Sequence, residues 1–185
     1  TRPAGVSPSP LGARTLDLRN LIRDVPDFPK PGILFRDITP ILANPKAFSA
    51  TIDALSAVAR LQGPTRVVGI ESRGFLFGAP VADRLHLPFA PIRKPGKLPF
   101  ETHAVSYDLE YGTDSVELHV DAVEPGDRVV VIDDLLATGG TAEAACRLVE
   151  RMGGIVTGVL VLIELAALGG AQRLSPRHVN ALIKY

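Results

Sequence analysis

The sequence has little cysteine, no excess of charge and no long apolar run, and each absence excludes a class of protein. The single Cys146 excludes an intramolecular disulfide framework, and with four scattered histidines it offers no zinc-ligand spacing. Lys+Arg and Asp+Glu number 20 each, so no overall positive field attracts nucleic acid or an anionic membrane. Any recognition of an anion must therefore be local.

No segment reaches the roughly 20 apolar residues of a membrane-spanning helix, and no charged-then-apolar signal opens the chain. A cytoplasmic protein is therefore expected. Residues 1–12 carry three prolines, two serines and few apolar side chains, which predicts a disordered tail. The remaining residues, 13–185, suit a single domain with a sizeable core.

Apolar periodicity predicts alternating helices and strands. Helices are expected over residues 15–24, 45–61, 74–85 and 142–152. Strands are expected over residues 66–70, 87–93, 129–132, 155–165 and 179–184, with a hairpin that pairs 105–109 with 116–120 and a loop over 169–175. This alternation predicts an α/β fold with a central, mainly parallel sheet, right-handed crossovers and flanking helices.

The most informative stretch is VVVIDDLLATGGT, residues 129–141. Its β-branched start is typical of a strand buried on both faces of a parallel sheet. Asp133 and Asp134 follow, and then small residues whose backbone N–H groups can surround a phosphate before a helix begins. Carboxylates placed here suit the vicinal hydroxyls of a ribose or the waters of a magnesium ion. The stretch therefore predicts a site for a ribose 5-phosphate at the C-terminal end of a strand.

This stretch resembles the phosphoribosyl pyrophosphate (PRPP) motif of the type I phosphoribosyltransferases. The resemblance implies their fold, with a small N-terminal hood and a flexible lid loop. It assigns the ribose phosphate of PRPP to Asp133, Asp134, Ala137, Thr138, Gly139, Gly140 and Thr141. It also implies Mg2+ as the cofactor, held by PRPP rather than by direct protein ligands, with contact to Asp133 through water.

The segment DVPDFPKPGILFRDITPIL, residues 24–42, is expected to be extended because its prolines forbid a regular helix. By composition alone it is a core-wrapping loop. It is similar, however, to the N-terminal hood of adenine phosphoribosyltransferases, which lies over the C-terminal ends of the strands. The resemblance implies that Phe35 stacks on adenine, beside Leu135. It also implies that the main chain of Leu34 and Arg36 hydrogen-bonds N1 and the exocyclic amine.

Two further segments carry residues expected to hold pyrophosphate. ESRG, residues 71–74, lies in a second strand-to-helix turn, and the family's loop here binds pyrophosphate through its backbone and its arginine, often after an unusual peptide geometry. RKPGK, residues 93–97, places three cations within five residues, although a solvated turn is the plain alternative. The residues expected at pyrophosphate are Ser72, Arg73, Arg93, Lys94 and Lys97. In related enzymes the arginine equivalent to Arg93 reaches the partner subunit's site, which implies a homodimer.

Residues 99–112 contain turn formers and no helical period, which predicts a long functional loop. SYDLEYG within it closely resembles the flexible lid of adenine phosphoribosyltransferases. The resemblance implies that Glu110 is the catalytic carboxylate and that Tyr107 or Tyr111 covers the reacting centre, where closure excludes water. Whether Glu110 stabilises C1 or manages the proton of the purine is left open, and the plain alternative is an exposed acid on an edge hairpin.

Together these motifs imply purine salvage, in which adenine and PRPP give AMP and pyrophosphate. An alternative among the enzymes is hypoxanthine or xanthine as the base. Against it stands the backbone recognition of the amine, because a carbonyl facing O6 would be left unpaired at roughly 1–3 kcal/mol. An alternative from another class is a regulator that senses PRPP and binds RNA or DNA. Such a protein usually needs a basic patch or an added domain, and the sequence has neither.

Overall fold

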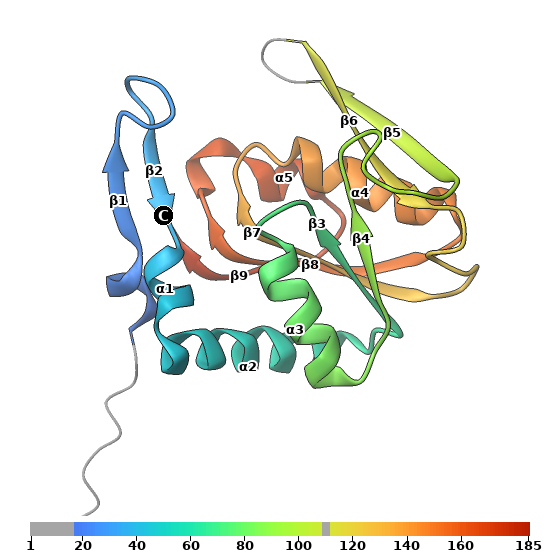
Figure 1. The fold of residues 1–185 in the computed structure, drawn as a ribbon, viewed down its shortest axis with the longest axis horizontal. Helices are drawn as coiled ribbons and strands as arrows, with labels where there is room; N and C mark the ends of the chain where they lie inside the picture. The colour runs from blue at the N-terminus through green and yellow to red at the C-terminus, as the bar shows by residue number, and fades with distance from the viewer. Residues whose placement is uncertain (1–16, 109–111) are drawn as a thin grey trace, which may run out of the picture. The chain divides into compact units, whose positions relative to one another are not determined.

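A computed structural model describes residues 17–108 and 112–185 (Figure 1). The chain divides into two compact units, residues 1–47 and 48–185. The tail expected over residues 1–12 lies outside the described residues, and so do Glu110 and Tyr111 of the expected lid. In the described parts of the chain, no helix is both long and apolar enough to cross a membrane.

The described part of the first unit is a short antiparallel hairpin between small helices. The 3-10 helix η1 (Leu18–Leu21) leads into β1 (Arg23–Pro26), which pairs with β2 (Leu34–Asp37), and α1 (Thr39–Ala43) follows. The helix expected over residues 15–24 was wrong in its described part. Among residues 17–24 only Ile22 of the apolar side chains is buried, and a helix of two turns that buries so little is marginal. Pairing with β2 satisfies the backbone instead.

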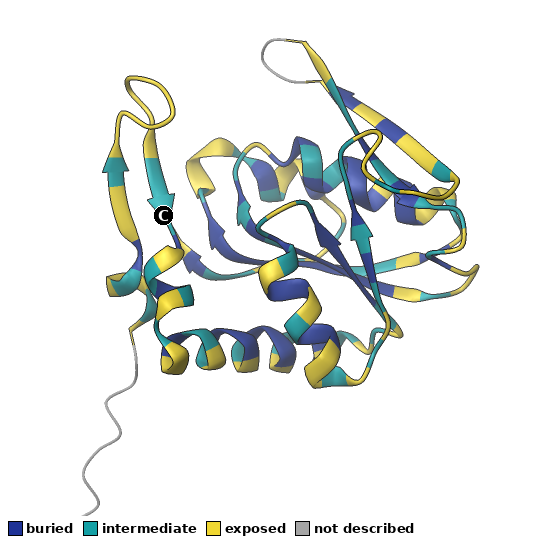
Figure 2. Ribbon diagram, in the orientation of Figure 1, coloured by how far each residue is buried: buried dark blue, intermediate teal, exposed yellow. Residues whose placement is uncertain are grey.

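The second unit is built on a five-stranded sheet in the order β4-β3-β7-β8-β9, with all neighbours parallel. The strands are β3 (Arg66–Ile70), β4 (Phe89–Ile92), β7 (Arg128–Leu136), β8 (Ile155–Glu164) and β9 (Val179–Lys184). Each one was predicted, and the α/β fold class is confirmed. The central strands β7 and β8 are largely buried, as Figure 2 shows.

Helices cover the sheet. Helix α2 (Pro45–Gln62) runs across the division between the units, α3 (Phe75–Leu85) follows β3, and α4 (Gly140–Arg151) follows β7. In Figure 1, α3 and α4 lie on opposite faces of the sheet. The loop expected over residues 169–175 was wrong, because α5 (Gly170–Leu174) forms there and buries Leu174. A helix of one turn leaves no periodic signal in the sequence.

The strand order indicates where a ligand crevice is expected before any side chain is considered. Strand β3 connects through α3 to β4 on one side, and β7 connects through α4 to β8 on the other. The direction of winding therefore reverses between β3 and β7. In open α/β sheets ligands bind outside the carboxyl ends of the strands at such a point. Residues 71–74 and 133–141, which sequence analysis singled out, lie at these two strand ends.

A hairpin of β5 (Thr102–Asp108) and β6 (Thr113–His119) packs on α4. The predicted hairpin forms, but its register differs from the expected pairing of 105–109 with 116–120, because Val105 lies opposite Val116. Both valines are buried with Leu118 in the core. Residues 102–108 of the expected loop 99–112 are therefore strand, because alternate side chains of β5 point to α4 and bury there. In the sequence, Glu110 and Tyr111 of the expected lid fall between these two strands, outside the described residues.

The turn before β7 is fastened by Asp127. Its carboxylate accepts hydrogen bonds from the backbone N–H of Glu124 (2.9 Å), from Thr65 Oγ1 (2.8 Å) and from Arg66 Nε (2.8 Å). Burial by itself raises the pKa of Asp127, but these hydrogen bonds outweigh it and hold the pKa below its usual value. A depressed pKa means that the stabilisation is present above the unfolded pKa, about 3.9, and is lost as pH falls through the folded pKa.

Asp127→Ala is therefore expected to lower the free energy of unfolding by about 1.5–3 kcal/mol at pH 7, because it leaves partly buried donors without their charged acceptor. Urea denaturation at pH 7 and near pH 3 measures the effect. The difference in the free energy of unfolding between variant and wild type should be smaller at the lower pH. Asp121→Ala, at an exposed position of the same connection, is the control and should change little. An equal loss for both variants would contradict the role of Asp127.

Candidate active site

The site begins at the carboxyl end of β7, which continues through both predicted acids to Leu136. Side chains alternate along a strand, so Asp133 and Asp134 point to opposite faces. Asp133 faces a cavity of about 120 Å³, whereas Asp134 is buried. The cavity is lined by Asp133, Leu135, Leu136, Ala137, Thr138, Gly139, Gly140, Thr141 and Ala142. The predicted ribose-phosphate residues are thus brought together around one cavity, except Asp134.

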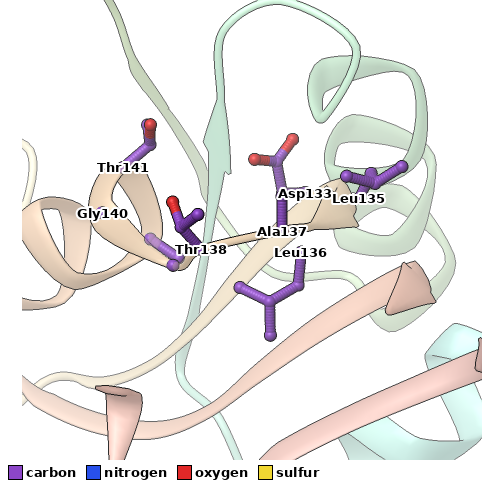
Figure 3. Close-up of a pocket in the computed structure, with 9 residues that line it drawn as sticks. Asp133, Leu135, Leu136, Ala137, Thr138, Gly140 and Thr141 are labelled. Atoms are coloured by element: carbon purple, nitrogen blue, oxygen red, sulfur yellow. The ribbon is translucent and has the colours of Figure 1, made fainter. Parts of the chain in front are cut away.

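The loop from Ala137 to Thr141 gives this cavity its polar wall. Gly139 has a φ of +84°, a left-handed conformation that a side chain would strain, and it precedes the first residue of α4. The N–H groups of the first helical turn have no partner within the helix and carry its positive dipole end. In Figure 3 the carboxylate of Asp133 and the hydroxyls of Thr138 and Thr141 point to the same side of the loop. This arrangement suits a phosphate next to a ribose.

The two adjacent carboxyls have unusual electrostatics. The pKa of Asp133 is raised well above its usual value, first by burial and then by the negative charge of Asp134. Burial also raises the pKa of Asp134, although the guanidinium of Arg73 opposes that rise. Arg73 Nε lies 2.8 Å from Asp134 Oδ2. Carboxyls whose pKa values are perturbed by burial and a like charge are typical of functional sites.

Arg73 comes from the turn between β3 and α3, residues 71–74. Its side chain is 38% exposed while that of Asp134 is 6% exposed, so the ion pair holds an arginine that still reaches solvent. The peptide bond from Glu71 to Ser72 is cis. Gly74 packs so closely on β7 that a Cβ there would lie 2.9 Å from Asp133 Oδ1. The turn therefore contacts both acids.

Arg93 and Lys94, which follow β4, form hydrogen bonds to the same turn. Glu71 Oε2 accepts from the backbone N–H of Lys94 at 2.8 Å and from Arg93 Nε at 3.2 Å, and Arg93 Nη1 donates to the carbonyl of Lys97 at 3.2 Å. Burial by itself raises the pKa of Glu71, but these hydrogen bonds outweigh it and lower the pKa. Glu71 thus stays ionised and fixes the start of the segment 93–97. Sequence analysis did not assign Glu71, although its position beside Ser72 was a signal.

Comparison with known proteins decides what kind of site this is. The sequence model of the phosphoribosyl transferase domain matches residues 37–179. The adenine phosphoribosyltransferase of Rhodopirellula baltica is 53% identical over 170 residues, which cover 92% of this chain and 82% of that protein. The chain belongs to the adenine phosphoribosyltransferase family. The resemblance drawn from the motifs is therefore confirmed.

Solved structures of the family agree with the fold. The adenine phosphoribosyltransferase of Thermoanaerobacter pseudethanolicus is 51% identical with a TM-score of 0.89, covering 91% of this chain and 98% of that one. The Saccharomyces cerevisiae enzyme, solved with adenine and an imino-altritol bisphosphate, is 38% identical with a TM-score of 0.84, covering 89% and 96%. The central sheet and its loops are thus those of the type I phosphoribosyltransferase fold.

Other predicted site residues lie in the first unit. Leu34 is exposed, Phe35 packs edge-on against Phe28 with ring centroids 5.1 Å apart, and Arg36 forms an ion pair with Asp24. Their recognition of adenine stays a prediction. So do the roles of Glu110 and Tyr111, which lie outside the described residues.

Sequence analysis gave one group at the phosphate loop a different role and missed another. Tyr107, predicted only as a cover, bonds Thr141 and Lys94 through its hydroxyl. Arg173 of α5 lies 3.5 Å, through Nη1, from the position of a Cβ on Gly140, and its Nε donates to Glu143 at 2.6 Å. No local pattern pointed to Arg173, because the segment that carries it was expected to be a loop.

Proposed function

We propose that this chain transfers the ribose 5-phosphate of PRPP to N9 of adenine and releases AMP and pyrophosphate, as in purine salvage. The observation that carries the proposal is the polar cavity at the end of β7, where one carboxylate and a helix N-terminus suit a ribose and its phosphate. Membership of the adenine phosphoribosyltransferase family supports the base.

In this proposal the loop 137–141 holds the 5-phosphate through its backbone N–H groups and hydroxyls. Asp133 accepts hydrogen bonds from the ribose hydroxyls. Asp134 acts indirectly, because its ion pair with Arg73 orients that guanidinium. Pyrophosphate is held by Ser72, Arg73, Arg93, Lys94 and Lys97. These cations stabilise the negative charge that develops as the bond to C1 breaks.

We propose that magnesium enters this site as an ion carried by PRPP. Within residues 17–108 and 112–185 no group of three or more His, Cys, Asp or Glu side chains could hold a metal ion. Asp133 is the one carboxylate among the residues lining the cavity, which suits contact through water. The ion, when bound, neutralises the leaving pyrophosphate.

For the base we propose that Phe35 stacks on adenine and that the main chain of Leu34 and Arg36 accepts from and donates to its edge. Glu110 is proposed as the catalytic carboxylate, and Tyr107 or Tyr111 as the cover that excludes water. A homodimer in which Arg93 acts in the partner's site, and a cytoplasmic location, also stay predictions.

The test is AMP formation from labelled adenine with PRPP and Mg2+, run beside guanine, hypoxanthine and xanthine. Adenine is expected to be favoured by about tenfold to a hundredfold, because the 6-oxo bases leave a buried backbone carbonyl facing an acceptor. Comparable turnover of hypoxanthine would contradict the assignment of the base. Binding of PRPP without turnover of any base would favour the PRPP-sensing regulator.

A further inference from the structure

A cluster of polar side chains lies between the phosphate loop, the end of β4 and the β5–β6 hairpin. Lys94 Nζ donates to Tyr107 Oη at 2.8 Å and forms an ion pair with Asp114. Tyr107 Oη donates to Asp114 Oδ2 at 3.1 Å and accepts from Thr141 Oγ1 at 3.1 Å. We call Tyr107, Asp114 and Thr141 the Lys94 anchor.

The hydroxyl of Tyr107 is fully used in this cluster. A phenol has one hydrogen to donate and two lone pairs that accept, and here it donates to Asp114 and accepts from Lys94 and Thr141. Its side chain is buried, with 6% of the residue exposed. A buried hydroxyl whose donor and both acceptor positions form hydrogen bonds has one orientation, so it fixes the side chains around it.

The ammonium group of Lys94 is held by two of its three N–H bonds. Both acceptors, Tyr107 and Asp114, sit opposite each other in the register of the β5–β6 hairpin. The third N–H remains for a phosphate oxygen, and the side chain is 37% exposed. A flexible lysine thus acquires a defined direction, which lowers the entropy lost when it binds an anion.

The charges in the cluster support this arrangement. The pKa of Asp114 is lowered, first by the hydrogen bond from Lys94, so the carboxylate is ionised at neutral pH. Burial works against the charge of Lys94, yet its hydrogen bonds to Asp114 and Tyr107 outweigh that and raise its pKa. Lys94 therefore keeps its positive charge beside the phosphate loop.

We propose that Asp114 and Tyr107 are positioning residues that orient Lys94 toward the pyrophosphate of PRPP. In this proposal the hydrogen bond from Thr141 to Tyr107 sets the position of the lysine relative to the phosphate loop. The inference rests on the proposed function, because Lys94 is taken as a pyrophosphate ligand. Neither Asp114 nor Tyr107 has to touch the substrate. Their effect is expected on the binding of PRPP and not on that of adenine.

Asp114→Asn keeps the shape of the side chain and removes the charge that holds Lys94. We expect the KM for PRPP to rise about tenfold, the KM for adenine to change less than about twofold, and kcat to fall less than the PRPP affinity. Tyr107→Phe, which removes only the hydroxyl, should act in the same direction. Ser106→Ala, at an exposed position of the same strand, is the matched control.

A double-mutant cycle separates positioning from a general loss of structure. In a Lys94→Ala background, Asp114→Asn should add almost nothing to the KM for PRPP, because the group that Asp114 positions is gone. Thermal unfolding of each variant shows whether it is folded. Full additivity would overturn the proposal, as would a lower KM for PRPP in Asp114→Asn, which would mean that Asp114 competes with the substrate for Lys94.

The outcome for the proposed function is read separately, from the wild-type protein. A wild type that makes AMP together with an Asp114→Asn variant of unchanged KM refutes the positioning role alone. A wild type that turns over no base refutes the proposed function, and direct titration with PRPP by calorimetry then still tests the anchor, since Asp114→Asn should weaken binding about tenfold.

Discussion

Asp133→Asn is expected to lower the turnover of PRPP by about a hundredfold or more and, at the same time, to make the ligand-free protein more stable. The loss of turnover follows because the neutral amide replaces charge-assisted hydrogen bonds to the ribose hydroxyls. The gain in stability follows because Asp133 is a partly buried carboxyl beside Asp134, and desolvation together with the neighbouring charge raises its pKa and makes its ionisation unfavourable in the folded state.

The sign of this effect depends on pH. A carboxyl whose folded pKa is raised contributes stability that is fully present below the unfolded pKa, about 3.9, and is lost as pH rises through the folded pKa. Wild type carries the penalty at pH 7 to 8, whereas the asparagine variant does not. The melting temperature of the variant should therefore exceed that of wild type at pH 7, and the difference should shrink toward pH 4.

Differential scanning calorimetry across this pH range, with initial rates of AMP formation, measures both effects. Asp121→Asn is the control, because Asp121 is exposed and lies outside the site. A variant that melts below wild type at pH 7 would contradict the electrostatic account. A variant that keeps its turnover would remove Asp133 from the ribose site.

Gly74→Ala is expected to damage stability and activity together. A Cβ on Gly74 would lie 2.5 Å from the carbonyl oxygen of Ile70. It would also lie 2.9 Å from the carbonyl oxygen of Ile132 and 2.9 Å from Asp133 Oδ1. Two of these atoms belong to the backbone of β3 and β7, which cannot yield without moving the strands. We expect the free energy of unfolding to fall by about 1–3 kcal/mol. Displacement of Asp133 should lower kcat/KM by about a hundredfold.

Urea denaturation and steady-state kinetics of the same preparation test this prediction. Gly126→Ala is the comparison, because Gly126 has a φ of +89° with nothing within 4 Å of its Cβ position. It should cost about 1 kcal/mol through backbone conformation alone and leave kinetics unchanged. Normal kinetics in both variants would contradict the prediction that the close packing of the turn 71–74 on Asp133 is needed for activity.

Much of the fold could be predicted because its signals are local. The β-branched run at 129–132 and the glycines at 139 and 140 determine a buried strand, a left-handed residue and a helix start within one short stretch. The alternation of such stretches predicted the parallel sheet. The wrong elements, the helix over 15–24 and the loop over 169–175, are short segments. Their conformation depends on what they pair with or bury against rather than on periodicity.

By itself, the sequence predicted a ribose-phosphate site, because the acids, the small residues and the helix start are consecutive from 133 to 141. Only the tertiary structure decided that Asp133 faces the cavity while Asp134 holds Arg73, and that Lys94 is bound by Tyr107 and Asp114. The physical reason is distance along the chain. Arg73 follows the end of β3, whereas Asp134 lies near the end of β7. The register of these strands and the alternation of side chains along them, rather than local propensity, place Arg73 Nε 2.8 Å from Asp134 Oδ2.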